Sequence, residues 1–433
     1  MKFNKWTLGL AAVGVVSLAS AARADEKINP LETALSNTTI SGYVSTSFNW
    51  QIDPGGAKSV SSPAGYIPFQ GQNKQDGFNL DVVKLSIAKP QDESPWASGY
   101  QVDLLFGPDA VGYNTSANAI GGQQNSFYSG ADYAIKQAYV VLRTPVGNGI
   151  DWKIGVFDSI VGYEVFDAGS NPNYTRSWGY AIEPTELTGI LGTYKVNDEW
   201  SVSAGIVNTS AAGINTRDNE SGAANPNGTG SGVGSYWHKG YTGLVTYTAP
   251  SSWGWAAGSS LYAGIVYGYV GSFSNAGGAP FGINYKNGYQ DGNQVNYYIG
   301  ATFNTPWKQL TTGVAWDYAQ NFAGGYDVPG LNESLDITTL GCYGTYKATD
   351  KLSLNGRGEW IYASAERNTP GTSNNYYGNG LELTGTLEYD MWANVISRLE
   401  LRWDHITGGD RLAAATVENT SSVGLYANII YKF

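Results

Sequence analysis

The chain has 433 residues, a formal net charge of −11, one cysteine and two histidines. These counts exclude a disulfide framework and argue against a multi-histidine metal site. The acidic balance argues against nucleic acid as a partner. Charged residues make up only 14% of the chain, against about 25% in a typical soluble domain.

The N-terminus resembles an export signal. It reads "MKFNKWTLGLAAVGVVSLASAARADE", with basic Lys2 and Lys5, an apolar run and an Ala22-x-Ala24 ending. This pattern predicts a signal peptide over residues 1–24, cleaved after Ala24. The alternative is a transmembrane anchor, but the apolar run is short and rich in Ala and Gly. We expect residues 25–37 to be a short periplasmic segment and residues 38–433 to form one domain.

The rest of the chain is a series of segments in which apolar and polar residues alternate. "TISGYVSTSFNW" near the start and "TSSVGLYANIIYKF" at the end both have this pattern. A period of two is typical of β-strands with two different faces. Sixteen such segments are expected, with starts near residues 38, 78, 98, 131, 149, 185, 199, 238, 255, 291, 308, 334, 350, 379, 396 and 420.

The connections between these segments alternate in length. The short ones are "PQDESPW", "PVGNG", Asn197–Asp198, "APSSWG", "NTPWK", "KATDK" and "DMWANV". Long Gly/Asn/Ser-rich connections lie between them, at 51–77, 107–130, 209–236, 271–290 and 364–378. This alternation is typical of outer-membrane barrels, which have tight periplasmic turns and large external loops. The sequence therefore predicts an all-β fold, a closed antiparallel transmembrane β-barrel of about 16 strands.

Tryptophans support this prediction independently. Half of the 14 lie at or beside the short connections: Trp96, Trp152, Trp200, Trp253, Trp255, Trp307 and Trp392. Amphipathic rings gather at the headgroup level of membranes. A soluble β-sandwich with Trp at its strand ends is the alternative, but it does not explain the two lengths of connection.

The last segment is expected to close the barrel. In lipid every backbone N–H and C=O must pair within the protein, so the final strand must pair with the first. Its terminal Phe433 also fits the C-terminal signature of bacterial outer-membrane barrels, which the barrel-assembly machinery reads.

Several blocks of the chain resemble a known family. "GYQVDLLFGPDA", "IKQAYVVLRTPVGNGIDWKIGVFDSIVGYEV", "NPNYTRSWGY" and "TGILGTYKVNDEWSVSAGIVN" are similar to the OmpL-like β-barrel porin family. "ISGYVSTSF" and "GFNLDVVKLSIAKP" fit the same family, so the likeness covers most of residues 38–210. The resemblance implies an outer-membrane diffusion channel of a Gram-negative bacterium. "EPTELTG", with Glu186 and Leu187, departs from the more polar residues expected there.

Two sets of charged residues are candidates for narrowing the lumen of such a channel. The first lies on two late strands, where apolar or small neighbours assign the charges to the lumen: Arg357, Glu359, Arg398, Glu400, Arg402 and Asp404. On the lipid side each arginine would cost about 2–4 kcal/mol at the midplane. The opposite charges could instead pair with one another and brace the wall, and both roles can hold together.

The second set lies on the third long connection, residues 161–186. It contains Glu164, Asp167, Arg176, Glu183 and Glu186. The resemblance implies that this loop folds inward, where it would face the wall arginines and create a transverse field. An ordinary solvated loop is the alternative. Asp151 and Lys153 also point inward by alternation.

We therefore expect an outer-membrane porin that lets small hydrophilic solutes diffuse through a water-filled lumen. Substrate-specific channels for oligosaccharides or anions, and a non-conducting structural or adhesive barrel, remain open alternatives. A homotrimer is expected from the size, and the partners are outer-membrane lipid and the solutes. We expect no enzyme activity, cofactor or metal, because neither His238 nor His405 lies beside a recognisable nucleophile.

Overall fold

The computed structural model of the protein describes residues 37–53, 74, 76–113, 133–210, 238–270, 292–322, 326–328, 331–369, 372–407 and 420–433. The predicted signal peptide, nearly all of the segment 25–37 and most of the long connections lie outside these residues. Among the described residues, no helix has the length and apolar composition needed to cross a membrane.

Almost every element is a β-strand. The strands are β1 (Thr39–Asp53), β2 (Gly77–Lys89), β3 (Ser98–Phe106), β4 (Tyr133–Thr144), β5 (Ile150–Asp158), β6 (Glu186–Lys195), β7 (Trp200–Val207), β8 (Gly240–Thr248), β9 (Ser260–Val270), β10 (Gly292–Asn304), β11 (Leu310–Gln320), β12 (Tyr326–Val328), β13 (Leu331–Lys347), β14 (Leu352–Thr369), β15 (Thr372–Trp392), β16 (Val395–Thr407) and β17 (Thr420–Lys432). The helical pieces are short, namely η2 (Pro108–Tyr113), η4 (Ala168–Ser170), α3 (Trp178–Ile182) and η5 (Ser251–Ala256).

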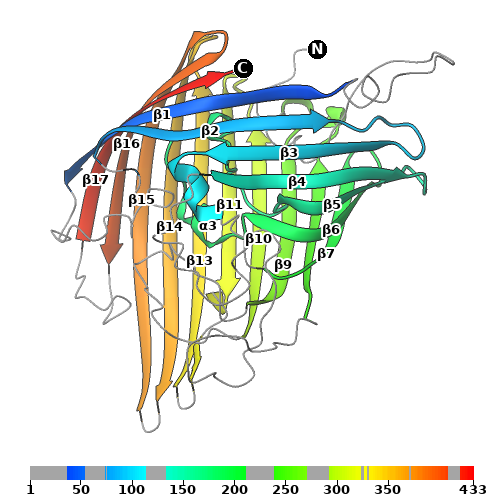
Figure 1. The fold of residues 1–433 in the computed structure, drawn as a ribbon. Coiled ribbons are helices and arrows are strands. Elements are labelled where there is room, and N and C mark those ends of the chain that lie inside the picture. Colours follow the sequence, from blue (N-terminus) through cyan, green and yellow to red (C-terminus); the bar gives the residue numbers. More distant parts are fainter. Residues whose placement is uncertain are drawn as a thin grey trace.

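The strands form one closed antiparallel sheet (Figure 1). Sixteen strands of the described chain, all but β12, build the barrel wall, as the sequence predicts. The sheet closes where β17 pairs with β1. At this seam the Phe433 N–H donates to the Gly42 carbonyl and the Gly42 N–H to the Phe433 carbonyl, each over 3.0 Å. Closure leaves no sheet edge that lipid would have to solvate.

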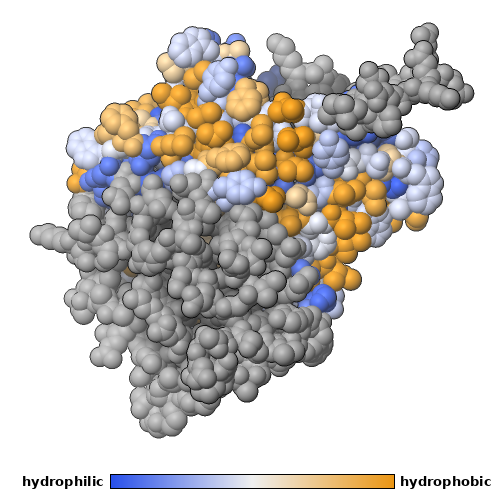
Figure 2. Space-filling view, in the orientation of Figure 1, coloured by the Kyte–Doolittle hydropathy of each residue, from blue (hydrophilic) through white to orange (hydrophobic). Residues whose placement is uncertain are grey.

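The two faces of each strand differ as the alternation predicts. On β1, Tyr43, Ser45 and Asn49 are buried toward the inside, whereas Ile40 and Trp50 are exposed on the outside. On β17 the inward Tyr426, Asn428 and Ile430 are buried, and the outward Ile429 and Tyr431 are exposed. Hydrophobic residues accordingly gather over the outer wall in Figure 2.

Short connections join the strands at one end of the barrel, and the predicted short turns are confirmed. Six of the seven tryptophans predicted beside them are exposed there: Trp96, Trp200, Trp253, Trp255, Trp307 and Trp392. The seventh, Trp152, donates its indole N–H to the Thr144 hydroxyl at 3.0 Å. Exposed rings at one level of the outer wall are expected of a membrane interface.

Three boundaries differ from the sequence predictions. The predicted long connection 364–378 is wrong, because β14 and β15 continue to pair as far as Thr369 and Thr372. β9 begins at Ser260 rather than near 255, since η5 occupies Ser251–Ala256. β12 was not predicted, and it pairs with the start of β13. Strand ends that are polar and rich in Tyr and Asn, such as those of β14 and β15, lack the apolar alternation from which a strand is predicted.

The outward assignment of the β16 leucines can be tested by placing a charge at mid-height. Leu401→Arg is expected to lower the free energy of unfolding in lipid vesicles by about 2–4 kcal/mol, because the guanidinium would face hydrocarbon. Leu261→Arg is the matched control, since Leu261 is the second residue of β9 beside a short turn and its arginine can reach the interface. Equal costs for the two variants in urea titrations would contradict the assignment.

Candidate functional site

The connection between β5 and β6, residues 159–185, is called loop 3 here because it is the third long connection. It includes η4 and α3, and Figure 1 shows α3 within the ring of strands. The predicted loop 161–186 therefore ends one residue too late, since Glu186 begins β6. Most loop 3 residues are buried, which excludes the alternative of a solvated surface loop.

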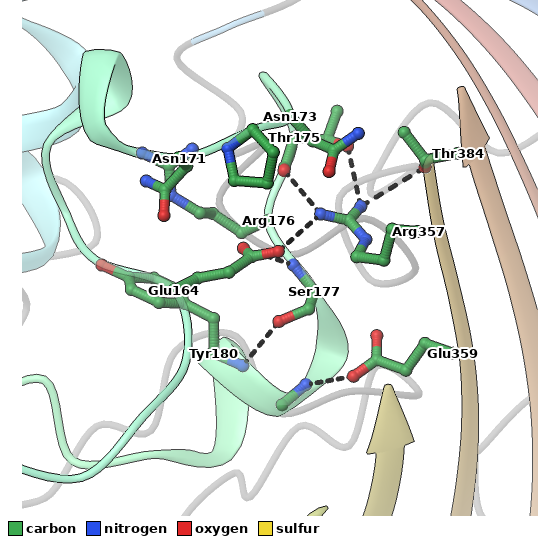
Figure 3. Close-up of polar contacts among 12 residues, drawn as sticks. Glu164, Asn171, Asn173, Thr175, Arg176, Ser177, Tyr180, Arg357, Glu359 and Thr384 are labelled. Atoms are coloured by element: carbon green, nitrogen blue, oxygen red, sulfur yellow. Dashed lines mark hydrogen bonds and ion pairs between the residues drawn. The ribbon is translucent and has the colours of Figure 1, made fainter. Parts of the chain in front are cut away.

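Arg357 of β14 is the centre of the contacts between loop 3 and the wall (Figure 3). Its guanidinium lies 2.8 Å from the Glu164 carboxylate of the loop and 3.0 Å from Glu382 of β15. It also donates to the Thr175 carbonyl at 2.8 Å and to the Thr175 hydroxyl at 3.0 Å. All three charged side chains are fully buried, so this ion pair has no competition from water.

Two wall carboxylates accept hydrogen bonds from the loop backbone. Glu400 of β16 accepts from the amides of Tyr174 at 2.6 Å and Thr175 at 2.9 Å. Glu359 of β14 accepts from the amide of Trp178 and from that of Gly179, the latter at 2.7 Å. Charge-assisted bonds to backbone N–H groups are among the stronger hydrogen bonds in proteins. These bonds attach loop 3 to the wall at two places, just before α3 and at the start of α3.

Two wall arginines bind loop carbonyls instead. Arg398 donates to the carbonyls of Ala168 and Asn171, both at 2.7 Å. Arg402 donates to the Arg176 carbonyl at 2.6 Å, while Asp404 holds its guanidinium with two bonds of 2.7 Å. The β14–β16 wall thus satisfies backbone groups of loop 3 that would otherwise be buried without partners.

A second attachment lies on β1, β2 and β17. Asp81 accepts from the Tyr174 hydroxyl of the loop at 3.0 Å and from Ser45 and Ser47 of β1 at 2.9 and 2.7 Å. Asn428 of β17 donates to the same carboxylate at 3.3 Å. The β1–β2 register shifts at this point, and the bulge lets both Asp81 and its neighbour Val82 be buried.

Apolar packing adds to these polar contacts. Trp178 and Ile182 of α3 pack with Ile337 and Ile361 on the wall, among other buried residues. Gly179 allows α3 to approach the wall closely, since a Cβ there would lie 2.8 Å from an Asp317 carboxylate oxygen. Loop 3 is consequently a packed part of the barrel interior.

Loop 3 also contacts the wall through a pair of carboxyl groups. Glu183 of loop 3 forms a side-chain hydrogen bond with Asp317 of β11. Burial and the neighbouring Asp317 charge raise the pKa of Glu183 well above its ordinary value of 4.5. A raised pKa favours the protonated carboxyl group, which is able to donate to its neighbour, so the pair joins loop and wall without a cation.

The predicted charges are in a different arrangement from the one we expected. We expected loop acids to face wall arginines across the lumen, but the structure joins Glu164 directly to Arg357. Arg176 donates to the Tyr174 and Phe166 carbonyls within its own loop, at 2.8 and 2.6 Å. Glu186 is fully buried, and neither of its carboxylate oxygens has a hydrogen-bond partner.

The remaining predicted residues lie on the opposite side of the interior. Asp167 of loop 3 lies 2.8 Å from Lys84 of β2, which also lies 3.1 Å from Asp103 of β3. Lys153 of β5 places its ammonium 4.9 Å from the centre of the Tyr139 ring. Asp151, beside the short turn, pairs with Arg143 at 2.8 Å.

Sequence analysis missed several residues of this site. Glu382 lies on the inward face of β15, at every second residue with Thr384 and Thr386. The same alternation argument could therefore have found Glu382. Asp81 was hidden by the bulge, which shifts the inward face of β2 by one residue. Tyr174 and Thr175 bind Glu400 through their backbone amides, and backbone contacts leave no sequence signal. No group of His, Cys, Asp and Glu among the described residues could hold a metal ion.

Removing Arg357 tests whether these buried contacts hold the fold together. Arg357→Leu is expected to lower the free energy of unfolding by about 3–5 kcal/mol, because Glu164 would stay buried without its cation and Glu382 would keep only Arg402, at 4.0 Å. Lys195→Ala is the control, since the Lys195–Asp198 pair is exposed at a short turn and its loss should leave stability unchanged. Urea unfolding in vesicles measures both, and similar small effects would contradict the assignment.

Comparison with known proteins agrees with this architecture. OmpT of Vibrio cholerae in its trimer form has a TM-score of 0.53 at 12% identity, covering 92% of this chain and 99% of that chain. The outer membrane channel DcaP of Acinetobacter baumannii gives 0.52 at 14% identity, covering 92% and 97%. An anion-selective porin from Comamonas acidovorans gives 0.51 at 11% identity, covering 92% and 99%. At these identities the likeness establishes the fold alone.

No curated protein has a matching sequence. A family described as "Putative beta-barrel porin-2, OmpL-like" matches residues 37–433, a range that includes all of the described residues. The resemblance that the sequence blocks suggest is thereby confirmed, and the chain belongs to this OmpL-like family of β-barrel porins.

Proposed function

We propose that the protein is a passive diffusion porin whose water path is narrowed by loop 3. The observation that carries the proposal is the direct attachment of this loop to the inside of the wall. The Glu164–Arg357 contact joins residues 193 positions apart. A segment held inside a sixteen-stranded barrel reduces a lumen that would otherwise be a wide aqueous channel.

In this proposal the buried charges of β14, β15 and β16 position the loop and do not contact solutes. Arg357, Arg402 and Glu382 are fully buried, so a passing solute cannot reach them. Their function would be to hold the constriction at a constant width. The water path would then run beside Asp158 and Asp167, which keep partly exposed carboxylates.

One observation favours the alternative of a non-conducting barrel. Loop 3 packs against opposite parts of the wall, with Phe166 and Ala168 among buried residues of β1–β4 and Trp178 among those of β11–β16. Such packing would suit a barrel whose interior is filled. Single-channel recording distinguishes the two functions directly.

The proposed location is the outer membrane, reached through export by the predicted signal peptide. We further propose that the barrel-assembly machinery recognises the C-terminal strand through Phe433. Its backbone pairs with Gly42 at the seam, while its ring is half exposed. Phe433→Ala is expected to lower the yield of folded, heat-modifiable barrel in cells severalfold, whereas refolding of the purified chain in detergent should be unaffected. An equal yield in cells would contradict this role.

We also propose a homotrimer. The wall is uneven, because β3 to β7 have 8 to 12 residues and β13 to β15 have 17 to 21. A low wall with an apolar outer face suits contact with neighbouring copies better than full exposure to lipid. The trimer form of Vibrio cholerae OmpT supports the same expectation. A monomeric mass in mild detergent would contradict it.

Planar-bilayer recording of the purified protein tests the porin function. The wild type is expected to give open steps of one stable size. Glu359→Ala combined with Glu400→Ala should give larger and noisier steps, because four backbone bonds that hold loop 3 are lost.

Glu93→Ala is the matched control, since Glu93 is exposed in a short turn, and it should behave as the wild type. Folded wild-type protein that never conducts would refute the porin function in favour of the non-conducting barrel. Conducting variants with wild-type step size would show that loop 3 does not set the constriction.

A further inference from the structure

Among the described residues, four ion pairs of the barrel interior have a side chain that is at least 21% exposed, and in all four the acid is the more exposed partner. Side-chain exposure is 1% for Lys136 against 40% for Asp158, and 8% for Lys84 against 39% for Asp167. For the other two pairs the values are 1% for Arg398 against 21% for Glu388, and 18% for Arg143 against 36% for Asp151.

The bases are buried because the protein itself surrounds them. Lys84 lies between Asp167 and Asp103, at 2.8 and 3.1 Å. Arg398 donates to two loop carbonyls as well as to Glu388. The N–H groups of each base therefore donate to protein oxygens. The carboxylate beside each base keeps oxygen lone pairs that face water.

Charges elsewhere do not reverse this pattern. Arg357 pairs with Glu164 and Glu382, and Arg402 pairs with Asp404. Arg176 is almost fully buried and donates to two carbonyls of its own loop. Lys153 and Lys432 are the opposing groups. Lys153 is partly exposed, with its ammonium over the Tyr139 ring, and exposed Lys432 donates to the Gly169 carbonyl of loop 3 at 3.2 Å. The water-facing charge of the described wall is nevertheless predominantly negative.

We infer that the channel is cation-selective, with Asp158 and Asp167 as the selectivity-determining residues of the narrow part and Glu388 and Asp151 toward its short-turn mouth. Carboxylates within a narrow path of low-dielectric walls raise the local concentration of cations and repel anions. This inference rests on the proposed porin function and adds the class of solute, small cations and cationic hydrophilic molecules. It differs from our sequence-based expectation, in which arginines faced the path.

The two acids of the narrow part lie on the same side of the interior. Asp158 ends β5 and Asp167 lies in loop 3, and both charges act on Lys84 of β2. Gln137 of β4 bridges Asp158 and Asp103, since its amide donates to the Asp103 carboxylate at 2.8 Å and its carbonyl oxygen accepts from the Asp158 backbone amide at 3.0 Å. Glu388 and Asp151 lie near the ends of β15 and β5 that meet short turns.

The test is the reversal potential of single channels in a potassium chloride gradient. Wild-type channels are expected to pass potassium severalfold better than chloride. Asp167→Asn should reduce this permeability ratio at least twofold without loss of folding, because Lys84 retains Asp103. Glu388→Gln should reduce it in the same direction, and Lys153→Gln should raise it.

Asp198→Asn is the matched control, since Asp198 is exposed on a turn outside the lumen, and its ratio should equal that of the wild type. A wild-type ratio of one or less, or ratios unchanged in both Asp167→Asn and Glu388→Gln, would overturn the inference and leave the porin function intact. Folded wild-type protein without any conductance would overturn the porin function, and the inference with it.

Discussion

The structure depends on the requirement that a sheet in hydrocarbon must pair all of its backbone groups within itself. Pairing of β17 with β1 meets this requirement. Once the sheet is closed, the period of two along each strand divides the chain into a lipid-facing set and an interior set. Charged residues can then be placed only on the interior face, which is where the β16 charges Arg398, Glu400 and Arg402 lie.

Burying charged side chains inside the barrel costs free energy, and loop 3 offsets this cost. A buried arginine or carboxylate is tolerated only where partners satisfy it. The loop supplies these partners, chiefly from its backbone: amides to Glu359 and Glu400, carbonyls to Arg398 and Arg402. The wall in turn supplies hydrogen-bond partners for loop 3, which has too little regular secondary structure to pair its own backbone groups. Loop and wall are therefore each incomplete without the other.

Sequence reasoning reached the architecture because alternation and connection length are direct consequences of a bilayer. It placed the β14 and β16 charges inward for the same reason. It failed where the signal is not periodic: Asp81 lies at a bulge, and Tyr174 binds Glu400 through its backbone amide. Sequence reasoning also assumed that charged side chains inside the barrel face water. Burial by a segment distant in the chain is a tertiary property, so Arg357 and Glu164 were expected across the lumen and lie in contact.

Loop 3 is bound to the wall through the buried contact between Glu164 and Arg357. A double-mutant cycle with Glu164→Gln and Arg357→Gln, read as free energies of unfolding in vesicles, measures that contact most directly. The account predicts a coupling energy above about 1 kcal/mol, as expected for residues in contact. Additivity within about 0.5 kcal/mol, the behaviour of distant independent sites, would contradict it.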